Sequence, residues 1–165
     1  MRILGIDPGL NITGYGVLDV DNDQQLSLVE AGIIEGGRNK EMPNRLRQLF
    51  DGINNVLGDL KPDVVAMEEL YSHYERPKTA ILMGHARGVF CLAVGQHGIP
   101  LAHYAATQVK RVLTGNGRAP KQQVQLAVTR QLNLESTPEP PDVADALAIA
   151  ACHYFLTKSS AIRLD

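Results

Sequence analysis

One short stretch constrains the fold of this chain more than any other. Residues 64–67, Val-Val-Ala-Met, form a continuous apolar run in which polar and apolar side chains do not alternate. Such a run is typical of a central strand covered on both faces, because a strand with one face in water alternates. Glu68 and Glu69 follow the run directly. The sequence therefore predicts a sheet between two layers, with an acidic group at the end of one strand.

Three strands and one helix are predicted before this run. The strands are residues 2–7, 14–20 and 26–34. Pro8-Gly9 ends the first strand just after Asp7, and the polar turn at residues 21–23 separates the other two, so the three form an antiparallel meander. Pro43 then opens a pattern with apolar residues at three-to-four spacing as far as Leu60, which predicts a helix.

Helices alternate with one further strand after the run. The predicted helices are residues 79–94, 108–113, 122–132 and 142–155, and the strand is 101–104. This order predicts an α/β fold, a mixed five-stranded sheet with helices on both faces. A chain of 165 residues is long enough for one core and too short for two. We therefore expect a single domain over residues 1–165, with its last ~8 residues as a tail.

Charge is unevenly distributed along the chain. The net charge is −2, which argues at first against a nucleic-acid partner. Residues 76–134, however, contain eight Lys and Arg and no Asp or Glu. This segment could hold phosphates, while the alternative is a solvated basic face.

Composition also excludes several classes of protein. The two cysteines, Cys91 and Cys152, both lie in apolar helical stretches, which argues against a disulfide framework and a thiolate metal site. The first residues do not resemble a signal peptide, and no apolar run is long enough to span a bilayer. We therefore expect a cytoplasmic protein.

Carboxylates recur where the predicted elements begin or end. Asp142 and Asp145 are three residues apart at the start of the last helix, so they share one face. Helix capping explains Asp142 well, but Asp145 lies in a mostly apolar helix and needs a partner or a metal ion. Asp7 has the same difficulty, because it closes an apolar strand.

Oxygen ligands without clustered His or Cys point to a hard cation. They suit Mg²⁺ or Mn²⁺ rather than Zn²⁺, and Mg²⁺ completes its shell with water and phosphate oxygens. Two such ions, about 3.5–4 Å apart, can activate water and stabilise the leaving oxygen of a phosphodiester. The pattern therefore favours phosphate chemistry.

Five motifs occur in order along nearly the whole chain. They are Gly-Ile-Asp-Pro-Gly at 5–9, Ala-Met-Glu-Glu at 66–69, Gly-His-Ala-Arg-Gly-Val at 84–89, Tyr-Ala-Ala-Thr-Gln-Val-Lys at 104–110 and the acidic helix start at 142–150. One motif alone would be weak evidence. The ordered set closely resembles the RuvC family of bacterial Holliday-junction resolvases.

The resemblance implies a fold and an activity. The fold is ribonuclease-H-like. The activity is that of a Mg²⁺-dependent crossover junction endodeoxyribonuclease, a hydrolase of DNA recombination and repair. Metal-activated water attacks the phosphodiester, and paired symmetric nicks in a four-way junction leave 5′-phosphate and 3′-hydroxyl ends.

The resemblance also implies a set of catalytic acids. Asp7, Glu68, Asp142 and Asp145 match the family's metal ligands, with two Mg²⁺ ions in each active site and Mn²⁺ as a substitute. Glu68 is preferred to Glu69 because the family's acid directly follows the last apolar residue of the strand, and adjacent strand residues face opposite sides.

Several further residues match DNA-binding positions of the family. Lys110 and Lys121 match basic positions near the cut phosphate and the attacking water, and both are predicted to be catalytic. Tyr71 matches an aromatic residue that stacks on a base at the crossover; Tyr74 is an alternative, and either could simply pack the loop. The remaining predicted DNA contacts are Arg76, Lys78, Arg111 and Arg118, although surface solvation also explains Arg111, Arg118 and Arg130.

Partners are implied as well. Two matched cuts in a junction of near-twofold symmetry suit a C2 homodimer. The resemblance places the dimer contact on the helix with Leu82, Gly84 and Ala86, whose small residues could equally serve packing within the chain. It also implies a branch-migration complex of the RuvA and RuvB type. The histidines 85, 97 and 103 are expected at the surface or behind the ligands.

Three other functions remain open from the sequence. Residues 5–9 also resemble the first phosphate-binding hairpin of actin-like and sugar-kinase-like ATPases, which need a second related domain for which this chain has no room. A junction-binding module without chemistry would be expected to lose one of the acids. A ribonuclease-H-like nuclease with another substrate would keep them all.

Overall fold

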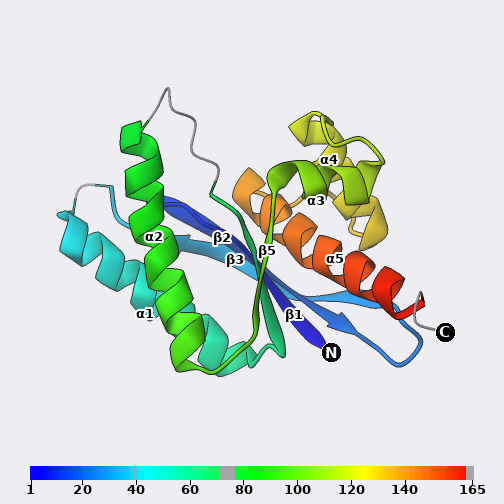
Figure 1. Cartoon of the computed structure of the whole chain (residues 1–165), viewed down its shortest axis with the longest axis horizontal. Helices are drawn as coiled ribbons and strands as arrows, with labels where there is room; N and C mark the ends of the chain where they lie inside the picture. Colours follow the sequence, from blue (N-terminus) through cyan, green and yellow to red (C-terminus); the bar gives the residue numbers. More distant parts are fainter. Residues whose placement is uncertain (39, 71–76, 163–165) are drawn as a thin grey trace.

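A mixed five-stranded sheet forms the centre of the molecule (Figure 1). The structure, a computed structural model, describes residues 1–38, 40–70 and 77–162, with side chains as far as residue 158. The strands are β1 (Arg2–Asp7), β2 (Ile12–Val20), β3 (Leu26–Glu35), β4 (Val64–Glu68) and β5 (Leu101–Tyr104). Their order across the sheet is β3-β2-β1-β4-β5.

The sheet is antiparallel on one side of β1 and parallel on the other. β1 pairs antiparallel with β2, which pairs antiparallel with β3. On its other edge β1 pairs parallel with β4, which pairs parallel with β5. The apolar run at residues 64–67 thus lies in an interior strand, and all four of its residues are buried. The predicted fold class and its central strand are confirmed.

Helices cover both faces of the sheet (Figure 1). On one face α1 (Met42–Leu60) and α2 (Pro77–Gln96) enclose a core that includes Ile6, Ile53 and Phe90. On the other face α3 (Ala106–Thr114), α4 (Lys121–Gln131) and α5 (Pro141–Ile162) enclose a core that includes Leu18 and Leu147. Two separate apolar cores explain why β1 and β4 carry apolar residues without alternation.

Glycines allow α5 to lie directly on the sheet. A Cβ atom at Gly5 of β1 would stand 2.0 Å from the carbonyl oxygen of Ala146, and one at Gly14 of β2 would stand 2.0 Å from that of Asp142. No side chain fits in this space, so the backbones of the helix and the two strands approach each other closely. This contact fixes the first turns of α5 above the end of β1.

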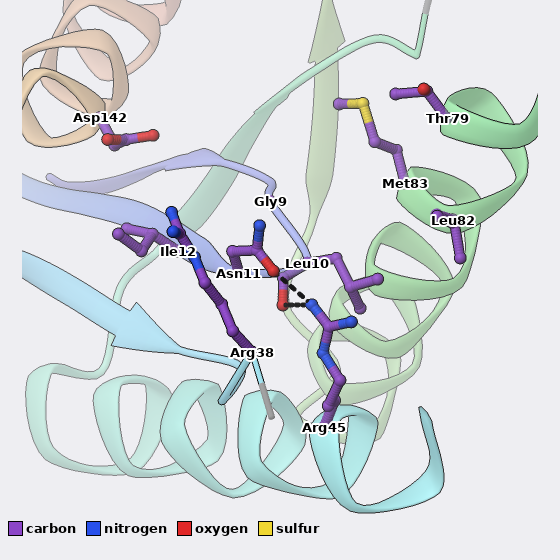
Figure 2. A pocket seen from close by; sticks show the side chains of 10 residues that line it. All are labelled: Gly9, Leu10, Asn11, Ile12, Arg38, Arg45, Thr79, Leu82, Met83 and Asp142. Carbon is purple, nitrogen blue, oxygen red and sulfur yellow. Dashed lines mark hydrogen bonds between the residues drawn. The ribbon is translucent and has the colours of Figure 1, made fainter. Parts of the chain in front are cut away.

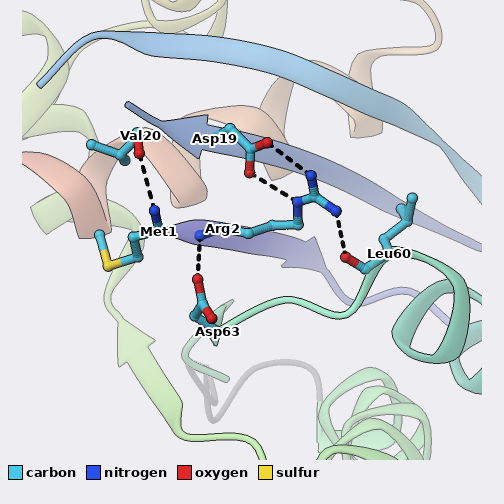
Figure 3. A network of polar contacts seen from close by, with 6 residues as sticks. All are labelled: Met1, Arg2, Asp19, Val20, Leu60 and Asp63. Carbon is cyan, nitrogen blue, oxygen red and sulfur yellow. Dashed lines mark hydrogen bonds and ion pairs between the residues drawn. The ribbon is translucent and has the colours of Figure 1, made fainter. Parts of the chain in front are cut away.

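A polar network fixes the opposite end of β1 (Figure 3). The Arg2 guanidinium donates two hydrogen bonds of 2.8 Å to the carboxylate of Asp19 on β2 and a third, also 2.8 Å, to the carbonyl oxygen of Leu60. The Arg2 backbone N–H donates to Asp63, just before β4. Arg2 thus ties β1 to the strands on both sides and to the end of α1.

The element boundaries agree with the sequence except at the last helix. The predicted strand at 101–104 and helix start near Pro43 are found as expected. α5 continues to Ile162 instead of ending at Phe155, so the backbone of residues 158–162, expected in the tail, is helical. None of the helices in the described ranges could cross a membrane.

Candidate active site

Two parallel strands bring two acids to the same edge of the sheet. Asp7 ends β1 and Glu68 ends β4, and the register pairs Ile6 with Met67, the residues just before them. Ile6 and Met67 lie in the core under α1 and α2. Because strand side chains alternate, Asp7 and Glu68 point to the opposite face, toward α5.

The first turns of α5 supply two more acids. Asp142 and Asp145 are half-buried, one turn apart, in the part of the helix held against β1 and β2 by the glycine contacts. The charge of each raises the pKa of Asp7, as does that of Glu68, so the other three acids all lie within electrostatic reach of Asp7. We call Asp7, Glu68, Asp142 and Asp145 the acidic cluster.

The charged forms of the carboxylates in the acidic cluster are destabilised. Burial, followed by the negative charges of Glu68, Asp145 and Asp142, raises the pKa of Asp7 to about 8. Burial also raises the pKa of Glu68, again with help from Asp145, and that of Asp145. Repulsion between desolvated carboxylates favours either bound protons or a bound cation.

Two lysines face this charge from the neighbouring helices. Lys121 Nζ, at the start of α4, lies 2.5 Å from Oδ2 of Asp145. Burial lowers the pKa of Lys121, but the hydrogen bond and charge of Asp145 outweigh this and raise it. Lys110 of α3 joins Lys121, Glu68 and Asp145 in lining a cavity of about 220 Å³, and its charge lowers the pKa of Glu68. We call this the lysine cavity.

The chemistry of the donors fits a hard divalent cation. The acidic cluster offers only carboxylate oxygens, and burial together with neighbouring carboxylates raises the pKa of Asp7, Glu68 and Asp145. The side chains have not converged on one point: in the described ranges, no three His, Cys, Asp or Glu side chains are grouped closely enough to hold an ion. Instead, the ammonium group of Lys121 forms an ion pair with one carboxylate oxygen of Asp145.

Glu68 and Glu69 have different surroundings. Glu68 is half-buried and turned toward α5, whereas Glu69 is exposed and its backbone N–H donates to Tyr104. Arg87 of α2 donates a hydrogen bond to the backbone carbonyl of Glu68 and lies 3.0 Å from Nδ1 of His103. Arg87 therefore fixes the end of β4. The sequence contains Arg87 in a motif but gave no reason to assign it this contact.

A second, larger cavity lies on the Asp142 side of the acidic cluster. It measures about 610 Å³, and Arg38, Arg45, Asn11 and Thr79 are among its lining residues (Figure 2). We call it the arginine cavity. Sequence reasoning missed both arginines, since Arg38 follows β3 and Arg45 lies on α1, outside every motif and outside the basic segment at 76–134.

The other predicted site residues are more scattered. Tyr71, its alternative Tyr74, and Arg76 lie outside the described residues. Lys78, Arg111 and Arg118 are exposed, as are the histidines at 85, 97 and 103. Sequence reasoning also missed His153 of α5, which is buried and lies 2.7 Å from the hydroxyl of Tyr104 through its Nδ1.

The predicted dimer residues differ in exposure. Leu82 is 41% exposed and Gly84 is partly exposed, but Ala86 is 0% exposed and packs in the core between α2 and the sheet. Ala86 therefore has no exposed surface in this chain, because its side chain lies on the face of α2 that packs against the sheet. Leu82 and Gly84 can still reach a partner.

Comparison with known proteins gives consistent results. A family model described as crossover junction endodeoxyribonuclease RuvC matches residues 3–153. The protein of that name from Rhodopirellula baltica is 55% identical over 157 residues, covering 95% of this chain and 88% of that one.

Solved structures are similar as well. RuvC from Thermus thermophilus has a TM-score of 0.88 and 32% identity, with 97% of each chain covered. A structure of the T. thermophilus protein in complex with Holliday junction substrate has a TM-score of 0.87 and 30% identity, with 96% of each chain covered.

Proposed function

The chain belongs to the RuvC family of crossover junction endodeoxyribonucleases, and from that premise we propose that its acidic cluster cuts DNA at Holliday junctions. It is a hydrolase with a ribonuclease-H-like fold, and its activity belongs to DNA recombination and repair. One observation carries the assignment of the site. Four carboxylates from three elements meet at one edge of the sheet, and burial together with their mutual repulsion raises the pKa of Asp7 to about 8.

The acidic cluster is proposed to hold the catalytic cations. Asp7 is central, since the other three acids all act on it, and it would be shared between two ions. Mg²⁺, or Mn²⁺ in its place, would supply Lewis acidity and a water of lowered pKa when bound. Glu68, Asp142 and Asp145 would complete the ligand set from β4 and α5.

The lysine cavity is proposed to receive the phosphodiester. Lys110 and Lys121 place positive charge beside Glu68 and Asp145, where a phosphate would otherwise be repelled. Lysine is a mobile point charge, so Lys121 can leave Asp145 for a phosphate oxygen as the cluster takes up cations. Water adds to the phosphorus and the P–O3′ bond breaks. This leaves a 5′-phosphate on one strand end and a 3′-hydroxyl on the other.

Paired nicks require two copies of this site. We infer that residues 1–165 act as one nuclease domain and that two chains form a C2 dimer through α2. Ile81, Leu82 and Met83 expose apolar surface on this helix, which supports the assignment. Branch-migration proteins of the RuvA and RuvB type are the proposed further partners, and the cytoplasm, where the DNA substrate lies, is the proposed location.

The decisive experiment measures cleavage of a synthetic four-way junction with a short homologous core. Wild type and Asp7→Asn are compared with Mg²⁺ and with EDTA, beside a linear duplex and an RNA–DNA hybrid. We expect symmetric nicks in the junction from wild type in Mg²⁺ alone, and no cutting by Asp7→Asn despite junction binding. Asp51→Asn, an exposed acid on α1, is the matched control and should cut normally.

Each component of the proposal can fail separately. Cutting by Asp7→Asn at the wild-type rate would remove Asp7 from the catalytic machinery. Preferential cutting of the hybrid would favour a ribonuclease-H-like enzyme with another substrate. Tight junction binding by wild type without cutting in either Mg²⁺ or Mn²⁺ would favour a binding module.

A further inference from the structure

The acidic cluster is divided between two cavities. Glu68 and Asp145 line the lysine cavity, whereas Asp142 lines the arginine cavity. Asp142 and Asp145 are one helical turn apart, so the two cavities lie on neighbouring turns of α5. A DNA strand with its cut phosphate at the acidic cluster must continue beyond it. The arginine cavity is a hollow that Asp142 itself lines.

Arg45 is held in place by neutral groups, and it forms no ion pair with any described carboxylate. Its Nη2 donates to the carbonyl oxygen of Leu10 at 3.1 Å and to Oδ1 of Asn11 at 2.5 Å (Figure 2). Both acceptors are uncharged. Its Nε is buried and has no hydrogen-bond partner within the described ranges. A guanidinium fixed by neutral groups, and in no ion pair with a described carboxylate, is suited to an anion, because the neutral hydrogen bonds already set its orientation.

Arg38 brings a second positive charge into the same cavity. Figure 2 shows its side chain extending past Ile12 on the side of the cavity where Asp142 lies. It is exposed, and it forms no ion pair with any residue that the structure describes. The acid that lines this cavity, Asp142, belongs to the acidic cluster, which has excess negative charge of its own to offset.

One further lining residue suits a nucleotide backbone, since Thr79 offers a hydroxyl from the first turn of α2. Guanidinium groups bind phosphate through two parallel hydrogen bonds, and backbone contacts of this kind set the register of a protein on DNA. Charge, donors and position therefore all match a phosphodiester next to the one that is cut.

We propose that the arginine cavity is a second phosphate site, in which Arg38 and Arg45 hold a backbone phosphate adjacent to the cut phosphate on the same DNA strand. This proposal rests on the proposed function, since it needs a DNA strand at the acidic cluster. Its role is to set the register of the strand, so that the correct phosphodiester lies over Asp7.

The first test measures junction binding in EDTA, where no cutting occurs. Arg38→Met is compared with wild type over a range of salt concentrations. We expect about tenfold weaker binding and a salt dependence whose logarithmic slope is lower by about 1, as for the loss of one phosphate contact. Arg47→Met is the matched control, because Arg47 is an exposed arginine on α1 that lines neither cavity. It should bind as wild type does.

The second test locates the phosphate. Junctions carrying a neutral methylphosphonate at either neighbour of the cut site are supplied to wild type and to Arg38→Met. At one of the two positions the substitution should weaken wild-type binding about tenfold and leave the variant unchanged, because the contact is already lost. Arg45→Lys, which keeps the charge but loses the fork, should show an intermediate loss at the same position.

The outcomes separate this inference from the proposed function. If Arg38→Met and Arg47→Met bind alike, or if neutral phosphates weaken wild type and Arg38→Met equally at both positions, the second phosphate site is refuted while cleavage by wild type still stands. If wild type binds junctions but does not cut them, the catalytic proposal fails, and the binding comparison still decides the phosphate site.

Discussion

Replacing Asp7 by Asn should stabilise the metal-free protein, although it removes a proposed catalytic group. Burial and three neighbouring carboxylates raise the pKa of Asp7 from 3.8 to about 8. The folded chain therefore holds this proton more tightly than the unfolded chain. Below pH 3.8, ionisation of Asp7 does not lower the free energy of unfolding. As pH rises from 3.8 to about 8, the loss of stability grows to its full size.

The magnitude follows from the size of the shift. A rise of about four pKa units from 3.8 to about 8 corresponds to roughly 5 kcal/mol of lost stability above pH 8. Relaxation of the neighbouring acids reduces this, so it is an upper limit. At about pH 5 the same reasoning leaves only about 1–2 kcal/mol. Asn is neutral and nearly the same shape, so the advantage of Asp7→Asn over wild type should grow by several kcal/mol between about pH 5 and about pH 9.

The assay is urea unfolding in EDTA at several pH values for wild type, Asp7→Asn and the exposed control Asp51→Asn. Only Asp7→Asn should gain stability relative to wild type as pH rises. Adding Mg²⁺ at the highest pH should then stabilise wild type more than the variant, because a cation relieves the same repulsion. A variant that is less stable than wild type at about pH 9, or a difference that does not change with pH, would refute the electrostatic reasoning.

Two further predictions concern the lysine cavity and the contact of α5 with the sheet. Lys121→Met removes the ammonium group that lies 2.5 Å from Asp145, so the cleavage rate should fall by a larger factor than the junction affinity. Single-turnover cleavage and equilibrium binding measure the two losses. Equal losses would show that Lys121 only anchors a phosphate. Gly5→Ala places a Cβ 2.0 Å from the carbonyl oxygen of Ala146 and should cost more than about 3 kcal/mol in urea unfolding, because backbone must move. Gly58 lies inside α1, where an added Cβ meets nothing within 4 Å, so Gly58→Ala should instead raise the free energy of unfolding by about 0.5–1 kcal/mol. Similar effects of the two substitutions would show that the close backbone contact does not determine the cost at Gly5.

Acids at strand ends could be predicted from the sequence because local pattern alone identifies them. Asp7 and Glu68 each follow an apolar run that fits only a buried strand, and the parallel pairing of β1 with β4 then brings them together. The preference for Glu68 over Glu69 agrees with strand alternation, since Glu68 faces α5 and Glu69 faces solvent. The position of the acids at strand ends depends on the period of the sequence, whereas the choice of Glu68 depends on the resemblance to the family.

Residues whose placement depends on tertiary structure could not be predicted in this way. Arg38 follows β3 and Arg45 lies on α1, and only the tertiary structure brings both into one cavity with Asp142. Arg87 contacts a backbone carbonyl, which carries no signal in the sequence of either partner. The resemblance to the family places the dimer contact on the helix that contains Ala86, and a small residue there suits both close helix contact and a tight core, which composition does not distinguish.

The glycine contacts beneath α5 also limit how the enzyme can move. At Gly5 and Gly14 no side chain separates the backbone of α5 from the strands, so the helix cannot slide or tilt there, and α5 and the sheet should behave as one rigid block. Adjustment to the shape of a junction is then left to longer side chains around this block, such as Lys121 and Arg38, and to the helix and the loop that carry them. The acids keep their spacing while the substrate is fitted to them.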